Sequence, residues 1–281
     1  MSQNKNAAAH LINEILSHDS YLHNHSVNVC ILGTAVLNRF NDLFEETKVD
    51  SLPDRHQISI AFFLHDTGKV FIDESVLEKK GLLTPEEFAE AKKHSYEKGL
   101  EILRANNINN TFAQNIVAYH HGPLYQGEEN CYPNDKLCTE IPPYVKICKL
   151  ADIYDARTSK RCYKEAYNPA VVMADMFKSY VNKDKILQLI LHSFVSVVGI
   201  CPPSSIVSLS NGQLAYVLDS NGPLIMPFTD IKGLAMTTSA EPIDLSEKEV
   251  SEKLTINKRV PSALPIEIYN KLPPYLKTSI K

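Results

Sequence analysis

Seven side chains of the kinds that bind metal ions occur where buried helices are expected to begin or end, or along their apolar faces. They are five histidines and two aspartates: His25, His65, Asp66, His94, His120, His121 and Asp152. Buried polar and charged groups are costly unless they find partners. A metal ion is such a partner, and helical bundles commonly build metal sites from side chains on facing helices.

The chemistry of this set favours two ions over one. Imidazole and carboxylate ligands without thiolate suit iron, manganese, nickel or zinc. Seven ligands are too many for one first-row ion with an open position. Asp66 could bridge two ions that together activate a water and hold a phosphate. Taken singly, each histidine has a simpler interpretation as a hydrogen-bonded residue of a core or a helix end, so a helical bundle without metal is the alternative.

The order of these residues resembles the HD superfamily of metal-dependent phosphohydrolases, and more narrowly its HD-GYP branch of cyclic-dinucleotide phosphodiesterases. The resemblance covers residues 20–165 and continues weakly to about residue 230. Three further segments carry it: HDTGKVFIDESVLEKKGLLTPEEF (65–88), HSYEKGLEIL (94–103) and LADIYDARTSKRCYKEA (150–166). A bare His-Asp pair would be weak evidence, whereas the whole ordered set is specific.

This resemblance implies a role for each residue. Two divalent metal ions are expected, iron or manganese in first place and nickel or zinc as alternatives. One ion would take His25, His65 and Asp152, and the other His94, His120 and His121, with Asp66 between them. Asp66 and Lys69 are the expected catalytic residues, and Lys69 would reach a phosphate oxygen. The remaining roles are substrate contacts for Lys69, Tyr132, Arg161 and Lys164, and support of a ligand or water by Asp155.

Two departures from the family pattern concern the surroundings of these ligands. In the loop after the paired histidines, the family's glutamate is Gly122 and the glycine of its GYP motif is Cys131, while Tyr132 and Pro133 remain. Cysteine adopts positive φ less readily than glycine, so this loop is expected to follow another path. Some family members hold a third metal with a glutamate, for which this chain has Tyr21. Two metals are therefore expected.

The function that follows is hydrolysis of a cyclic dinucleotide to a linear dinucleotide, to mononucleotides, or to both. Cyclic di-GMP is the first choice of substrate and a mixed cyclic GMP–AMP dinucleotide the next. Two alternatives stay open: an HD-type phosphohydrolase of another nucleotide, and a catalytically weak module that senses a dinucleotide or binds a partner. The altered loop could receive a GGDEF-type protein partner, and a homodimer is also open.

The elements that must position these residues are helices. Residues 5 to 197 read as a helical series, and TPEEF (84–88) opens one helix with a capping box. After Gly199 the pattern alternates and Asn-Gly occurs at 211–212 and 221–222, which predicts a hairpin and a further strand. The expected fold is mainly α, an HD-type helical bundle with a small C-terminal β-hairpin extension. The predicted parts are a helical phosphohydrolase domain (1–199), a β extension (200–235) and a polar tail (236–281).

Composition sets the outer limits. The 281 residues carry a net charge of −4, which argues against a broad basic surface for DNA. No run approaches the roughly 20 apolar residues of a membrane span, and the N-terminus lacks the pattern of a signal peptide. Six scattered cysteines without a CxxC pair indicate reduced thiols and not a disulfide framework. A cytoplasmic protein without membrane contact is therefore expected.

Overall fold

The computed structural model describes residues 20–43, 55–159, 166–221, 223–237 and 240–257. The chain divides into two compact units. Among the described residues, the first unit contains 20–43, 55–156 and 180–193, and the second contains 157–159, 166–179, 194–221, 223–237 and 240–257. Among the described helices, none is both long enough and apolar enough to cross a membrane.

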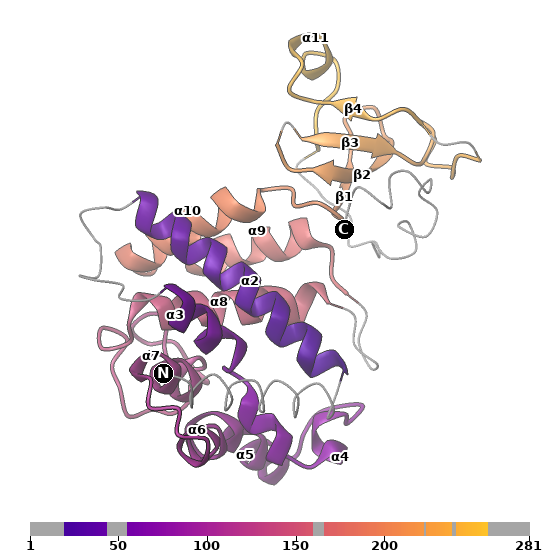
Figure 1. Cartoon of the computed structure of the whole chain (residues 1–281). Coiled ribbons are helices and arrows are strands. Elements are labelled where there is room, and N and C mark those ends of the chain that lie inside the picture. Colours follow the sequence, from indigo (N-terminus) through magenta and orange to yellow (C-terminus); the bar gives the residue numbers. More distant parts are fainter. Residues whose placement is uncertain (1–19, 44–54, 160–165, 222, 238–239, 258–281) are drawn as a thin grey trace. The chain divides into compact units, whose positions relative to one another are not determined.

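The first unit is a helical bundle (Figure 1). Its helices, with α8 and α10 ending in the second unit, are α2 (Ser20–Leu43), α3 (Arg55–Phe63), α4 (Glu74–Leu77), α5 (Pro85–Lys93), α6 (Leu100–Ala105), α7 (Thr111–Tyr119), α8 (Pro143–Thr158) and α10 (Lys185–Val198). The 3₁₀ helix η2 (Thr67–Phe71) follows α3, and the π-helical turn η3 (His94–Gly99) joins α5 to α6. The mainly helical prediction is confirmed for the described residues.

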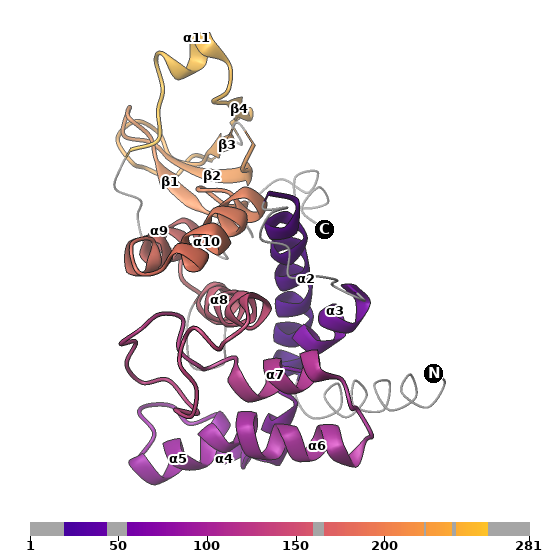
Figure 2. The ribbon, with the colours of Figure 1, turned by 90° about the vertical axis from the view of Figure 1, so that its left-hand side faces the viewer.

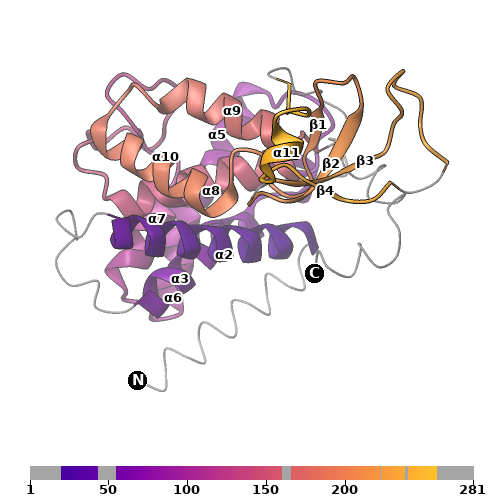
Figure 3. The ribbon, with the colours of Figure 1, turned by 90° about the horizontal axis from the view of Figure 1, so that it is seen from above.

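The core of this unit comes from helix faces that are apolar at helical spacing. Fully buried side chains include Val29, Val36, Ile58, Phe62, Ile116 and Val145. Gly33 lets α2 approach α3 closely, because a Cβ there would meet the Phe62 ring at 3.0 Å. Figure 3 shows α2 running alongside α3, and Figure 2 shows α7 between α3 and α6. This packing brings separate helices of the unit close together.

The predicted capping box at the start of α5 is present. Thr84 Oγ1 accepts a hydrogen bond from Glu87 N, and the Glu87 carboxylate accepts one from Thr84 N. Pro85 occupies the first turn, where a missing N–H costs nothing. The box fixes where α5 begins, and therefore the distance along the helix to His94 at its other end.

The second unit contains α9 (Pro169–Tyr180, except its last residue) and a small antiparallel sheet. The strands are β1 (Ile206–Ser208), β2 (Leu214–Asp219), β3 (Leu224–Pro227) and β4 (Ile243–Asp244), in that order (Figure 1). Val207, Ala215, Val217 and Ile225 form its buried face with Leu245. The antiparallel pairing of β1 with β2 around Asn211-Gly212 and of β2 with β3 agrees with the prediction, while Gly222 of the second Asn-Gly pair lies outside the described residues. The sheet extends further than predicted, because β4 pairs with β3 from the segment assigned to the polar tail.

Candidate metal centre

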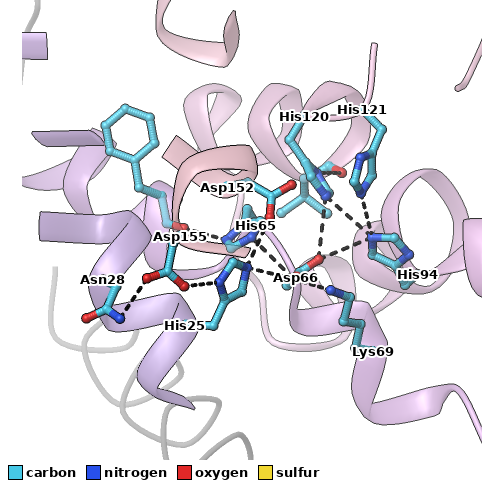
Figure 4. A network of polar contacts seen from close by, with 12 residues as sticks. His25, Asn28, His65, Asp66, Lys69, His94, His120, His121, Asp152 and Asp155 are labelled. Carbon is cyan, nitrogen blue, oxygen red and sulfur yellow. Dashed lines mark hydrogen bonds and ion pairs between the residues drawn. The ribbon is translucent and has the colours of Figure 1, made fainter. Parts of the chain in front are cut away.

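The seven candidate ligands come from five parts of the first unit and meet at one place (Figure 4). α2 carries His25, and α8 carries Asp152. The other five lie at helix ends or in irregular helical turns: His65 and Asp66 between α3 and η2, His94 at the start of η3, and His120 and His121 after α7. Such positions allow a side chain to turn away from the regular helix face and point into the centre.

Asp66 lies in the middle of the cluster, and its two oxygens face opposite groups of imidazoles. Its Oδ1 is 3.2 Å from His94 Nε2 and 3.5 Å from His120 Nε2. Its Oδ2 is 3.5 Å from His25 Nε2 and 3.3 Å from His65 Nε2. The Asp66 side chain is almost completely buried. This is the arrangement expected of a carboxylate shared between two ions.

The ligand atoms fall into two groups that share Asp66. One group contains Asp66, His94, His120 and His121, and the other contains His25, His65 and Asp66. Within each group the ligand atoms lie within 4.8 Å of one another. Asp152 stands outside both groups, but its Oδ1 is 3.1 Å from His25 Nε2. The resemblance assigns His25, His65 and Asp152 to one ion and His94, His120 and His121 to the other, and this assignment stays a prediction.

Hydrogen bonds to the far side of the rings determine which nitrogen is free to bind an ion. His65 Nδ1 contacts the Phe62 carbonyl at 2.9 Å, and His94 Nδ1 contacts the Ala91 carbonyl at 2.5 Å. His120 Nδ1 contacts two carbonyls of α7, each at 3.1 Å. A carbonyl can only accept, so Nδ1 carries the proton and Nε2 presents its lone pair. Ligating histidines are typically oriented in this way.

The polar atoms at the centre lack ordinary partners, which tests whether a cation fits. Three buried atoms, His25 Nε2, His65 Nε2 and Asp66 Oδ1, have no hydrogen bond of acceptable geometry among the described residues. His94 Nε2 lies 3.4 Å from His120 Nε2 and 3.3 Å from His121 Nε2. Lone pairs that converge so closely repel one another unless a cation lies between them. The residues therefore fit divalent metal ions.

The ionisation of the cluster is also suited to cations. Burial lowers the pKa of His94 and of His121, and the neighbouring histidines lower that of His121 further, so these rings are neutral near pH 7. Burial would raise the pKa of Asp66, but the charges of Lys69 and His65 outweigh it and hold that pKa well below its usual range.

His25 differs from His94 and His121. Burial lowers its pKa, but the nearby carboxylates of Asp152, Asp155 and Asp66 raise it well above its ordinary value. Three carboxylates thus favour a positive charge at this point, either an imidazolium or a metal ion.

Gly68 explains how Asp66 and His94 come together. A Cβ at Gly68 would lie 1.8 Å from the His94 carbonyl oxygen and 2.6 Å from the Gly99 nitrogen. Only a residue without a side chain allows η2 to approach the π-helical turn so closely. π-helical turns occur frequently at functional sites. Here the turn begins at His94, whose ring reaches the Asp66 carboxylate.

Polar side chains next to the ligands hold them in place. Lys69 Nζ donates to Asp66 Oδ2 at 2.5 Å and remains partly exposed. Asp155, the predicted supporting residue, places its Oδ2 2.6 Å from His25 Nδ1. Asn28 donates to the other oxygen of Asp155 at 2.8 Å. Sequence reasoning missed Asn28, although it lies on α2 one turn after His25.

The loop after the paired histidines covers one side of the centre. Tyr132 stacks on the His121 ring, with centroids 4.5 Å apart and an interplanar angle of 29°. Its backbone N–H donates to the His121 carbonyl at 3.2 Å. The predicted substrate contact Tyr132 is therefore adjacent to the ligands. Two others, Arg161 and Lys164, lie outside the described residues.

Two buried lysines of α8 hold this loop, and sequence reasoning missed both. Lys146 donates to the Leu124 carbonyl at 2.9 Å. Lys149 donates to the Gly122 carbonyl at 2.8 Å and to the Glu128 carboxylate at 3.0 Å. Glu128 also accepts from the Leu124 N–H at 2.6 Å. The loop is thus held by charged hydrogen bonds at the place where its sequence departs from the family pattern.

Comparison with known proteins gives a family match and several relatives. Residues 22–157 match the family model of the HD domain. A cyclic di-GMP phosphodiesterase of Pseudomonas aeruginosa is 28% identical over 206 residues, which cover 73% of this chain and 46% of the relative. A 3'3'-cGAMP-specific phosphodiesterase of Vibrio cholerae is 33% identical over 140 residues, 49% of this chain and 26% of the relative.

A cyclic di-GMP phosphodiesterase response regulator of Xanthomonas campestris is 36% identical over 122 residues, 43% of this chain and 31% of the relative. The chain therefore matches less than half of the length of each of these three relatives.

Proposed function

Because residues 22–157 match the family model of the HD domain, we propose that the chain is a metal-dependent phosphodiesterase that hydrolyses a cyclic dinucleotide. The observation that carries this proposal is the position of Asp66, whose two oxygens face two separate groups of imidazole nitrogens. Burying a carboxylate among imidazoles costs free energy, and ionisable groups in such surroundings are typical of functional sites.

The proposed ligand roles follow the two groups. His25, His65 and Asp152 would hold one divalent ion, and the group of His94, His120 and His121 would hold the other. Asp66 would be shared. Bound ions supply two kinds of chemistry at such a site: they lower the pKa of a water, and they stabilise charge on a phosphate. Histidine and carboxylate ligands agree best with iron or manganese, with nickel and zinc as alternatives.

The protein's own side chains would orient the carboxylate and the substrate. Lys69 holds Asp66 Oδ2 and has a partly exposed ammonium group, so it can also donate to a phosphate oxygen as negative charge grows there. Asp155 holds His25 by its Nδ1 and fixes the direction of Nε2. Tyr132 closes one side of the site and would contact the substrate.

Cyclic di-GMP is the proposed first substrate, and the mixed cyclic GMP–AMP dinucleotide the second. Relatives that bear these activities in their names support the choice. Water would add to one phosphodiester, and the ribose 3′ oxygen would leave with a proton. The product is the linear dinucleotide, and a second cleavage would give mononucleotides.

The test combines metal counting with turnover. Purified protein is expected to contain two metal ions per chain, measured by inductively coupled plasma mass spectrometry. It is also expected to linearise cyclic di-GMP. Asp66→Ala is expected to lose both ions and at least about 1,000-fold in kcat, because both groups lose a shared ligand. Asp73→Asn, which changes an exposed carboxylate nearby, serves as the control and should retain metal and activity. Intact substrate with both ions bound, or full activity in Asp66→Ala, would refute the proposal.

A further inference from the structure

We propose that Phe88 and Lys92 of α5, together with Tyr132, form a subsite that binds a guanine base of the substrate. The inference rests on the proposed function, because it assigns a base-binding role beside the phosphate chemistry. It goes beyond the predicted contacts, which included Tyr132 but neither residue of α5.

A row of aromatic rings leads from the metal centre to the surface. The Tyr132 ring stacks on His121 at 4.5 Å and meets the edge of His94 at 6.3 Å. The Phe88 ring also approaches Tyr132 edge to face, with centroids 6.5 Å apart. A base that lies beside Tyr132 would therefore belong to a nucleotide whose phosphate is at the ligands.

Phe88 has an exposed ring that packing does not explain. The residue is 43% exposed although it lies next to the partly buried Tyr132. Every nucleobase has a flat face that stacks on such a ring, and each stacked base contributes about 1–3 kcal/mol by alanine substitution, or roughly 5- to 150-fold in affinity. Stacking on this ring would thus contribute affinity for any base, without distinguishing guanine from adenine.

Lys92 adds selectivity. Its Nζ lies 4.3 Å from the centre of the Phe88 ring and 5.5 Å from that of Tyr132. In the described part of the chain this ammonium group has no hydrogen-bond or ion-pair partner, whereas the adjacent Lys93 pairs with Glu90 at 2.7 Å. The ammonium group therefore lies over the Phe88 ring, and its N–H donors have no acceptor among the described residues.

The chemistry of an ammonium group favours guanine over adenine. Guanine presents two acceptors, O6 and N7, on one edge, and lysine can donate to both. Adenine presents N7 beside an amino group, which is itself a donor and opposes the lysine. A lysine that has only donors therefore accepts guanine and disfavours adenine at the same position.

The experiment measures kcat/KM for cyclic di-GMP and for cyclic di-AMP in the full chain. Lys92→Met should lower kcat/KM for cyclic di-GMP about 10-fold, mainly through KM, and change that for cyclic di-AMP less than about 2-fold. Lys92→Arg should restore the preference. Lys93→Met removes the same charge one residue further along the chain. It should change kcat/KM by less than about 2-fold for either substrate.

The stacking contribution has its own pair of variants. Phe88→Ala should raise KM for both substrates, by about 5-fold or more, because stacking does not distinguish the bases. Phe177→Ala in α9, which removes a ring of similar exposure (39%), should leave KM unchanged. An equal effect of Lys92→Met on both substrates, or an effect no larger than that of Lys93→Met, overturns the inference.

Binding of GMP and AMP by equilibrium dialysis separates this inference from the proposed function. If the wild type hydrolyses no cyclic dinucleotide, the proposed function fails. The subsite is then still supported when GMP binds better than AMP and Lys92→Met removes the difference. It is overturned when the two nucleotides bind alike or the variant retains the preference.

Discussion

At the scale of single residues, the candidate ligands are oriented by groups that hydrogen-bond the side of each ring that points away from the centre. Asp155 is the clearest example, because it holds His25 Nδ1 at 2.6 Å and is itself held by Asn28 at 2.8 Å. The pair joins α2 to α8 and determines which nitrogen of His25 faces the centre. Each ring whose Nδ1 is bonded in this way is oriented before any ion arrives.

Asp155→Asn is expected to weaken the binding of one ion and not the other. An amide is neutral and can present its NH₂ to His25, which removes the charge and the fixed tautomer. Loss of such a supporting partner typically costs 10- to 100-fold in metal affinity. Titration with manganese should show one weakened and one unchanged site. Equal weakening of both sites would contradict the grouping, and Asp175→Asn on α9 serves as the control.

Residue type, helical spacing and order along the chain single out the seven candidate ligands, and their role as ligands stays a prediction. The same reasoning did not find Asn28, Lys149 or Glu128. Asparagine on a helix and charged residues in a polar loop usually face solvent, so their types give no signal. Lys149 and Glu128 meet only because α8 packs under the loop, a contact between residues 21 positions apart.

At the scale of elements, the close approach of η2 to the π-helical turn brings the ligands of the two groups together. Gly68→Ala would place a methyl carbon 1.8 Å from the His94 carbonyl oxygen and 2.6 Å from the Gly99 nitrogen. Both are backbone atoms, which cannot rotate away as a side chain can. We expect a loss of at least about 3 kcal/mol in the free energy of unfolding, at the upper end of overpacking effects.

Urea denaturation and metal counting test the Gly68→Ala variant. The protein should be destabilised and should also lose the ions that His94 helps to bind. Gly33→Ala is the matched control, since its methyl would meet only the Phe62 ring, which can shift, at 3.0 Å. If Gly68→Ala is as stable as the wild type, η2 and η3 can move apart without lowering the free energy of unfolding.

The loop from Gly122 to Tyr132 depends on the ion pair between Lys149 and Glu128. Lys149→Met would leave a largely buried carboxylate without its cation, and breaking a buried pair costs about 3–5 kcal/mol. The loop can reduce this cost by detaching from α8. Hydrogen exchange at the Tyr132 amide, which donates to the His121 carbonyl, should then become faster.

The double variant Lys149→Met/Glu128→Gln should recover part of this loss, because no uncompensated charge remains. Lys232→Met, an exposed lysine of the second unit, is the control for loss of one positive charge. Unchanged exchange at Tyr132 in Lys149→Met would mean that the loop is held by its other contacts.

Local elements were predicted better than long-range pairings. The capping box at Thr84 and the hairpin at Asn211-Gly212 depend on residues a few positions apart, so the sequence contains the whole signal. Strand β4 has two residues and no turn signal of its own. It exists because Ile225 and Leu224 of β3 offer partners to Ile243 and Asp244. Such pairing depends on the folded chain and was therefore not predicted.

At the scale of the whole molecule, metal removal is expected to lower stability as well as activity. An ion present at 100 times its Kd contributes about 2.7 kcal/mol, so two ions contribute about 5 kcal/mol. For a chain of this size the melting temperature should fall by roughly 10–20 °C when a chelator is added. Differential scanning calorimetry tests this, and the melting temperature of Asp66→Ala should not respond to the chelator.

The crowding of imidazole nitrogens around Asp66 has a consequence for the life of the protein in a cell. Without cations, the converging lone pairs and the buried carboxylate favour opening of the helices that carry them. Opened chains are the ones that proteases degrade, so a loss of a few kcal/mol reduces abundance severalfold. Scarcity of the divalent ions that the centre is proposed to bind would then lower the amount of the protein as well as its activity.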